Sequence, residues 1–183
     1  MRDEPIKAPI DITQHWIQSF VVDLNLCPFA KREVTRNAID FRVYEGSDQE
    51  GILHALRDAI ETLDDNQSIE TSFLILPSAI PDFRDFNDFQ DVIQRLLELM
   101  NRVGIYQLVG FHPRYQFAGT AVDDAENYTN RSPYPMLHIL RESSVDRAVE
   151  SSADAVLICD QNVTTLNQLG AIELEARWRA CFG

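Results

Sequence analysis

The stretch Ile69–Leu76, with the sequence IETSFLIL, decides the fold. Its last four residues, Phe73 to Leu76, form an unbroken apolar run. A short run of this kind favours a strand, and the lack of alternation is typical of a strand that is buried on both faces of its sheet. The sequence therefore predicts a buried central strand here.

Helical and strand patterns alternate on both sides of this stretch. We expect a helix over 11–26, a strand over 38–44, a helix up to about 63, a helix over 85–102 and a strand over 105–111. Ser47 with Glu50 resembles a capping box for the second helix, and Gly104 is placed to cap the third. Helices that join strands of this length usually make parallel crossovers.

The later part of the chain is less regular. Residues 136–140 favour a short strand, Ser144 is placed to start a helix that ends near 150, and 162–180 form a final helical pattern. The apolar segment 153–159 fits either a helix or a strand. Residues 112–135 show neither periodicity, and loops this long in compact domains are usually functional or disordered.

These patterns predict an α/β fold in a single domain over residues 1–183. We expect a sandwich with a mixed sheet of four or five strands flanked by helices. The alternative is a ferredoxin-like α+β arrangement whose sheet is open on one face.

Composition and charge argue against several classes of protein. The formal net charge is −13, so the chain would repel nucleic acids and anionic membranes. No apolar run is long enough to span a membrane, and residues 1–10 do not resemble an export signal. Three cysteines without a C-x-x-C pair fit a reducing compartment. We therefore expect a soluble cytoplasmic protein that binds neither nucleic acid nor membrane.

The candidate site covers residues 112–142, which contain the segments HPRYQF and NYTNRSPYPMLHILRE. It follows an expected strand directly, and ligands of α/β sheets bind beyond the carboxyl ends of strands. Arg114, Arg131 and Arg141 would form a fork-shaped receptor for a small anion, because guanidinium binds carboxylate or phosphate bidentately. The other expected substrate-binding residues are Tyr115, Asn127, Asn130 and Ser132. Alternatively, these polar side chains satisfy buried backbone groups of a long loop.

Three residues are candidates for the chemistry itself. His112 begins the loop and is placed to act as acid or base. His138 would assist, although a histidine on an apolar strand is more often a hydrogen-bonded core residue. Cys27 would be a nucleophile, paired with His112, because Lys31 and Arg32 follow closely and cations favour the thiolate. A buried, inert cysteine is the usual alternative.

The sequence implies no cofactor and no metal. The common nucleotide-binding and hydrolase motifs do not occur, and the candidate ligands have no zinc-site spacing.

Three blocks are recognisable together: WIQSFVVDLNLCPFAKREV at 16–34, GFHPRYQFAG at 110–119 and NYTNRSPYPMLHILRE at 127–142. They resemble a family of bacterial proteins of about this length that is known only as a domain of unknown function. The resemblance lends no catalytic role to any residue. It implies only that Cys27, His112 and Arg131 lie within the marked blocks of that family.

Two functions are compatible with these observations. The first is a cytoplasmic enzyme that acts on a small anionic metabolite through the Arg- and His-rich loop. The alternative is a non-catalytic module that binds a ligand or a protein through the same loop.

Overall fold

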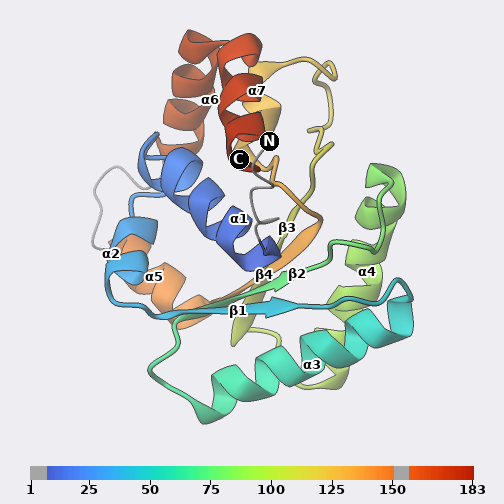
Figure 1. Cartoon of the computed structure of the whole chain (residues 1–183). Coiled ribbons are helices and arrows are strands. Elements are labelled where there is room, and N and C mark those ends of the chain that lie inside the picture. Colours follow the sequence, from blue (N-terminus) through green and yellow to red (C-terminus); the bar gives the residue numbers. More distant parts are fainter. Residues whose placement is uncertain (1–7, 151–156) are drawn as a thin grey trace, which may run out of the picture.

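The computed structural model describes residues 8–150 and 157–183, which contain a mixed four-stranded sheet with the strand order β1-β2-β4-β3 (Figure 1). The strands are β1 (Ile39–Val43), β2 (Thr71–Ile75), β3 (Tyr106–Phe111) and β4 (Met136–Arg141). β1 and β2 are parallel, whereas β4 is antiparallel to both of its neighbours, β2 and β3. β3 therefore points the same way as β2 without pairing with it, because β4 lies between them.

The central strand is β2, which is buried along its whole length, as the apolar run predicts. Two helices cover one face of the sheet, α3 (Gln49–Asp65) and α4 (Phe83–Leu99) (Figure 1). Their core includes Leu56, Leu74 and Leu137, each of which has at most 1% of its surface exposed. Burial of one such side chain stabilises a fold by roughly 1.5–3 kcal/mol.

Helices also cover the opposite face, where the core includes Trp16, Phe20, Phe73 and Leu166. They are α1 (Pro9–Trp16), the π-helix η1 (Ile17–Val22), α6 (Ile158–Leu169) and α7 (Ala171–Ala180). The predicted sandwich with a mixed sheet is thus confirmed, and the ferredoxin-like alternative is wrong because both faces carry helices (Figure 1).

Two short helices lie at the end of the sheet where β1 begins and β4 ends (Figure 1). They are α2 (Ala30–Thr35) and α5 (Glu142–Glu150). At the other end of β4 lies the predicted loop 112–135, which contains one short 3₁₀ helix, η2 (Ala125–Thr129). None of the helices in the described part of the chain is both long and apolar enough to cross a bilayer.

Several predicted helix ends are wrong for local reasons. The cap of α3 is Asp48, whose carboxylate accepts a hydrogen bond from the Gly51 N–H (2.7 Å), so Ser47 and Glu50 form no capping box. The C-cap of α4 is Met100, and the next residue, Asn101, has the left-handed conformation with φ 56°. The left-handed cap residue is therefore Asn101, three residues before the cap predicted at Gly104. An αL residue lets the following N–H turn back to the helix, and Arg102 N–H bonds to Leu97 O (2.9 Å).

Two predicted helices are divided. The helix expected over 11–26 changes from α to π at Ile17 and ends at Val22. The helix expected over 162–180 is two helices, because Gly170 adopts φ 78° and ψ 155° between α6 and α7. Of the ambiguous segment 153–159, residues 153–156 lie outside the described residues.

Candidate functional site

The asparagine and serine side chains of the loop 112–135 hydrogen-bond to the backbone of the loop and of the adjoining end of β3. Asn127 has no exposed surface. Its Oδ1 accepts a hydrogen bond from the Phe117 N–H (3.0 Å), and its Nδ2 donates to Ala121 O (2.8 Å). Asn130 Nδ2 donates to Gly110 O (3.1 Å), and Ser132 Oγ donates to Tyr134 O (2.5 Å).

Arg131 and Tyr115 are part of the same internal packing. Arg131 Nε donates to Tyr115 O (3.2 Å), and its guanidinium carbon lies 4.8 Å from the centre of the Tyr128 ring. The Tyr115 ring packs against Phe83 and Phe117, with both ring centres 4.9 Å away, and burial raises the pKa of the Tyr115 hydroxyl. These contacts fit the alternative expectation that the polar residues hold the loop together.

The structure does not bring the three arginines of the predicted receptor together. Arg114 donates to Pro81 O and lies 3.7 Å from Asp82, beside the start of α4. Arg141 lies at the far end of β4, where its Nε donates to Ile69 O (3.1 Å). Five residues of strand place it about 17 Å from Met136, where the loop joins β4. Strand geometry therefore separates Arg141 from the loop arginines.

His112 is locked between the loop and α4. Only 1% of its surface is exposed, and the rings of Phe83 and Phe86 lie 5.5 and 5.2 Å away. Its Nδ1 accepts from the Arg114 N–H (3.0 Å), so the proton is on Nε2, which faces Ile80 O at 3.3 Å. Burial lowers the pKa of His112. Both ring nitrogens thus hold backbone groups in place.

His138 lies on the other face of the sheet. Its ring stacks on Phe73 with the centres 3.9 Å apart, and its Nε2 lies 2.6 Å from Thr71 Oγ1. Thr71 donates its only hydroxyl proton to Ile139 O (2.6 Å), so His138 Nε2 must donate to Thr71. Burial lowers the pKa of His138 to about 3. His138 is therefore a neutral, hydrogen-bonded histidine, and its Nδ1 carries the lone pair.

Cys27 lines a hollow of about 420 Å³ between α2 and α5, which we call the α2–α5 hollow. The residue is partly exposed, and its thiol forms no disulfide. The apolar part of the lining includes Phe29, Leu140 and Val145. The polar side chains of the lining are those of Arg32, Glu33, Glu70, Ser144 and Arg147. His112 does not line the hollow, and both of its ring nitrogens bond to backbone groups elsewhere, so the structure does not bring Cys27 and His112 together.

Ionic contacts join α2, α5 and the start of β2 around this hollow. Glu70 accepts a hydrogen bond from Ser144 Oγ (2.7 Å) and lies 3.7 Å from both Arg36 and Arg147. Glu33 lies 3.6 Å from Arg32 and 3.5 Å from Arg36. Three arginines thus meet two glutamates here, whereas acidic residues outnumber basic ones in the whole chain, 29 to 16.

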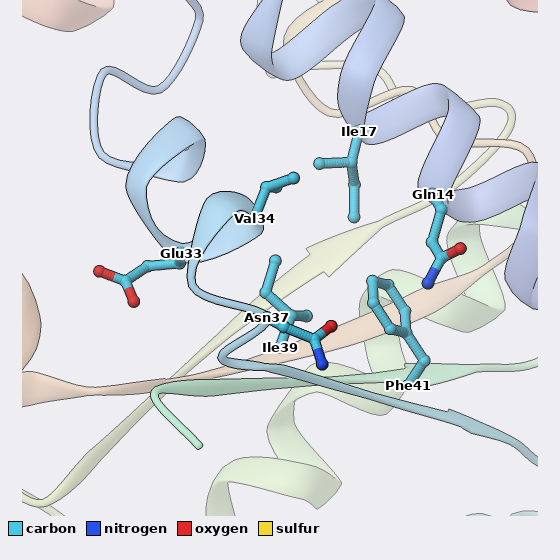
Figure 2. A pocket seen from close by; sticks show the side chains of 7 residues that line it. All are labelled: Gln14, Ile17, Glu33, Val34, Asn37, Ile39 and Phe41. Atoms are coloured by element: carbon cyan, nitrogen blue, oxygen red, sulfur yellow. The ribbon is translucent and has the colours of Figure 1, made fainter. Parts of the chain in front are cut away.

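A second, smaller hollow of about 210 Å³ lies under α2, between α1 and the outer edge of β1 (Figure 2). Figure 2 shows the amide of Gln14 above the ring of Phe41, and Ile17 and Val34 facing each other across the opening. We call it the edge hollow. Glu33 lines both hollows, so they lie on the two sides of α2.

Among the residues that the structure describes, no group of three or more His, Cys, Asp and Glu side chains is arranged to hold a metal ion.

Residues 8–176 match the model of a protein family described as "Protein of unknown function (DUF1415)". The chain belongs to this family. The match includes all three recognisable blocks, so the resemblance is confirmed. Neither a curated protein nor a solved structure matches the chain. The DUF1415 description states no activity, so a function has to be argued from the hollows and side chains of the chain itself.

In this DUF1415 chain, sequence reasoning singled out Cys27 and Arg32 but missed Glu33, Glu70 and Arg147. Ser144 was expected only as a helix start, yet its hydroxyl binds Glu70. One signal pointed to Glu70, a charged residue directly before a wholly buried strand. No pattern in the sequence connects Glu70 to Arg147, which is 77 positions later.

Proposed function

We propose that the protein is an enzyme that acts on a small anionic molecule in the α2–α5 hollow. Its nucleophile is the Cys27 thiol. The observation that carries this proposal is a partly exposed free cysteine that lines a hollow of about 420 Å³ whose polar walls include Arg32 and Arg147. Small-molecule sites usually have volumes of roughly 300–1,000 Å³, with mainly apolar walls and a few polar groups.

The position of the thiol supports a chemical role for Cys27. Of the three cysteines, Cys159 is exposed on α6 and Cys181 is buried at the C-terminal end of α7. Neither lines the α2–α5 hollow. Covalent catalysis needs a thiol that a substrate can reach and that the protein partly encloses, and Cys27 meets both conditions.

The two wall arginines support an anionic substrate. The side chains of Arg32 and Arg147 are 73% and 63% exposed, so their guanidinium groups lie at the mouth of the hollow. Their contacts with Glu33 and Glu70 are long, at 3.6 and 3.7 Å. Exposed ion pairs of this kind contribute little to stability, so a bound carboxylate or phosphate can replace them at low cost.

A pair of alkylating reagents tests the proposal. Iodoacetate and iodoacetamide both transfer a carbon to sulfur with loss of iodide, but only iodoacetate is an anion. We expect the iodoacetate-to-iodoacetamide rate ratio, measured by mass spectrometry, to be about fivefold higher at Cys27 than at Cys159. This corresponds to about 1 kcal/mol of attraction between charges in a water-exposed site. Cys159 is a control in the same molecule.

The double variant Arg32→Ala with Arg147→Ala should lower the Cys27 ratio to that of Cys159. Equal ratios at the two cysteines of the wild-type protein would refute an anion site. Anionic metabolites that protect Cys27 from alkylation would then give the substrate class. A metabolite that protects Cys27 but is never converted would instead identify a non-catalytic binding module.

A further inference from the structure

We infer that a second copy of the chain pairs with the outer edge of β1. The two β1 strands run antiparallel about a two-fold axis at Phe41 and join the two sheets into one. This inference concerns an interface and does not depend on the proposed activity.

The outer edge of β1 has unpaired backbone groups. β1 is the last strand on its side of the sheet. Ala38 O accepts from the Glu70 N–H (2.8 Å), and the Tyr44 N–H donates to Ile75 O (2.9 Å), so even-numbered residues face β2. Because strands alternate with a period of two, the backbone groups of Ile39, Phe41 and Val43 point outward. Within the described residues they have no hydrogen-bond partner.

An exposed edge of this kind is a template for pairing with another strand. In a two-fold antiparallel pair centred on Phe41, Ile39 of each copy lies opposite Val43 of the other. Residues that lie opposite each other with outward-facing backbone groups exchange two N–H···O bonds. All of the outward-facing backbone groups of β1 then find partners.

The charges of β1 select this register. Centring the axis on Phe41 places Asp40 of each copy opposite Arg42 of the other, whereas an axis on Asp40 or Arg42 places like charges together. Opposite charges in facing positions stabilise strand pairs and like charges destabilise them. Asp40 and Arg42 already contact each other within one chain at 2.6 Å, with side chains 23% and 30% exposed. Because these side chains are partly exposed, the Asp40–Arg42 ion pair of one copy can contact the Asp40–Arg42 ion pair of the other.

Asp40 and Arg42 lie on the face of β1 that α3 covers, and the side chains on its other face, toward α1, support the same register. Ile39, Phe41 and Val43 are only partly buried and pack beside the core under α1. Phe41 is held by stacking on Phe73, with ring centres 5.8 Å apart, and it lines the edge hollow (Figure 2). At the two-fold axis the two Phe41 rings face each other, and aromatic cross-strand pairs add to stability. The dimer thus removes apolar surface from water beside the edge hollow.

Charge-reversal variants test the interface. Sedimentation equilibrium of the wild-type protein should show a concentration-dependent mass that approaches twice 20.9 kDa. Asp40→Arg or Arg42→Asp alone places like charges opposite each other and should raise the dimer dissociation constant about tenfold or more, because facing charged pairs contribute on this scale. An equimolar mixture of these two variants should form a heterodimer, because each reversed copy then faces opposite charges.

The mixture distinguishes pairing from misfolding, since a merely destabilised chain is not rescued by a different destabilised chain. A wild-type protein that stays monomeric at every concentration overturns the inference. A dimer that neither variant weakens shows that another surface is used and overturns it as well. Both readouts measure mass, so either failure leaves the Cys27 proposal untouched.

Discussion

The loop 112–135 and the α2–α5 hollow differ in how their polar side chains are used. The loop has the higher density of histidine, arginine, asparagine and tyrosine, but these groups hydrogen-bond to the backbone of the loop, of the end of β3 or of the segment before α4. The hollow takes Cys27, Glu70 and Arg147 from distant segments, and these groups face a space that a ligand can enter. A candidate site is therefore better identified by polar groups that face a space open to a ligand than by the number of polar groups in a segment.

Asn127→Ala should have the largest effect on stability if the loop is held by its own polar groups. The change leaves the Phe117 N–H and the Ala121 carbonyl without their partner, and an unsatisfied buried group costs about 1–3 kcal/mol. We expect the free energy of unfolding to fall by about 3 kcal/mol in urea denaturation. Asn167→Ala, on the exposed surface of α6, is the matched control and should change it by less than about 0.5 kcal/mol. Equal effects would contradict the comparison.

The pH dependence of the free energy of unfolding should report on His138. This residue lies in β4, two positions before Leu140, which lines the α2–α5 hollow. Its folded pKa is about 3, below the unfolded value of about 6.5, so the unfolded chain takes up the proton first as the pH falls. The free energy of unfolding should therefore be unaffected by this group above pH 6.5 and decrease below it, by up to about 2 kcal/mol at pH 5.

His138→Phe keeps an aromatic ring on Phe73 and should remove this part of the pH dependence. His54→Phe, at an exposed position of α3, should leave it unchanged. Urea denaturation between pH 5 and pH 8 measures both. If wild type and His138→Phe lose stability in parallel as the pH falls, His138 is not the partly buried, neutral group that the structure describes.

The smallest expected effects on the free energy of unfolding distinguish Arg131 in the loop from Arg147 at the α2–α5 hollow. Arg131 donates to the backbone of the loop and covers the Tyr128 ring, so Arg131→Ala should lower the free energy of unfolding by about 1–2 kcal/mol. Arg147 is 63% exposed, so Arg147→Ala should change it by no more than about 0.5 kcal/mol. Thermal unfolding of the two variants measures the difference. An unchanged melting temperature for Arg131→Ala would return the loop to consideration as a binding site.

Local sequence patterns identified most of the regular elements. The apolar run at 73–76 predicted the buried β2, and the stripe of α4 predicted a long amphipathic helix. Both predictions depend only on the order of apolar and polar residues within one segment of the chain. The helix ends were less predictable, because Asp48 and Ser47 are equally good capping residues and only the backbone conformation at Asp48 decides between them.

The candidate site could be predicted only in part. Cys27 and Arg32 are neighbours in sequence, so their proximity follows from chain connectivity. The loop arginines looked like a receptor because the sequence shows which side chains exist but not which backbone groups they bind. Arg141 illustrates the error, since it lies in the same sequence block as Arg131 but at the other end of β4.

The sequence by itself determined the α/β class, most of the strand and helix segments, the net charge of −13 and the membership of the family. These follow from composition, periodicity and local order along the chain. Only the tertiary structure decided that β4 inserts between β2 and β3, that Glu70 meets Arg147, and that β1 is left with an open edge. The physical reason is that these features depend on which distant segments pack together, and that choice is made by the free energy of the whole core.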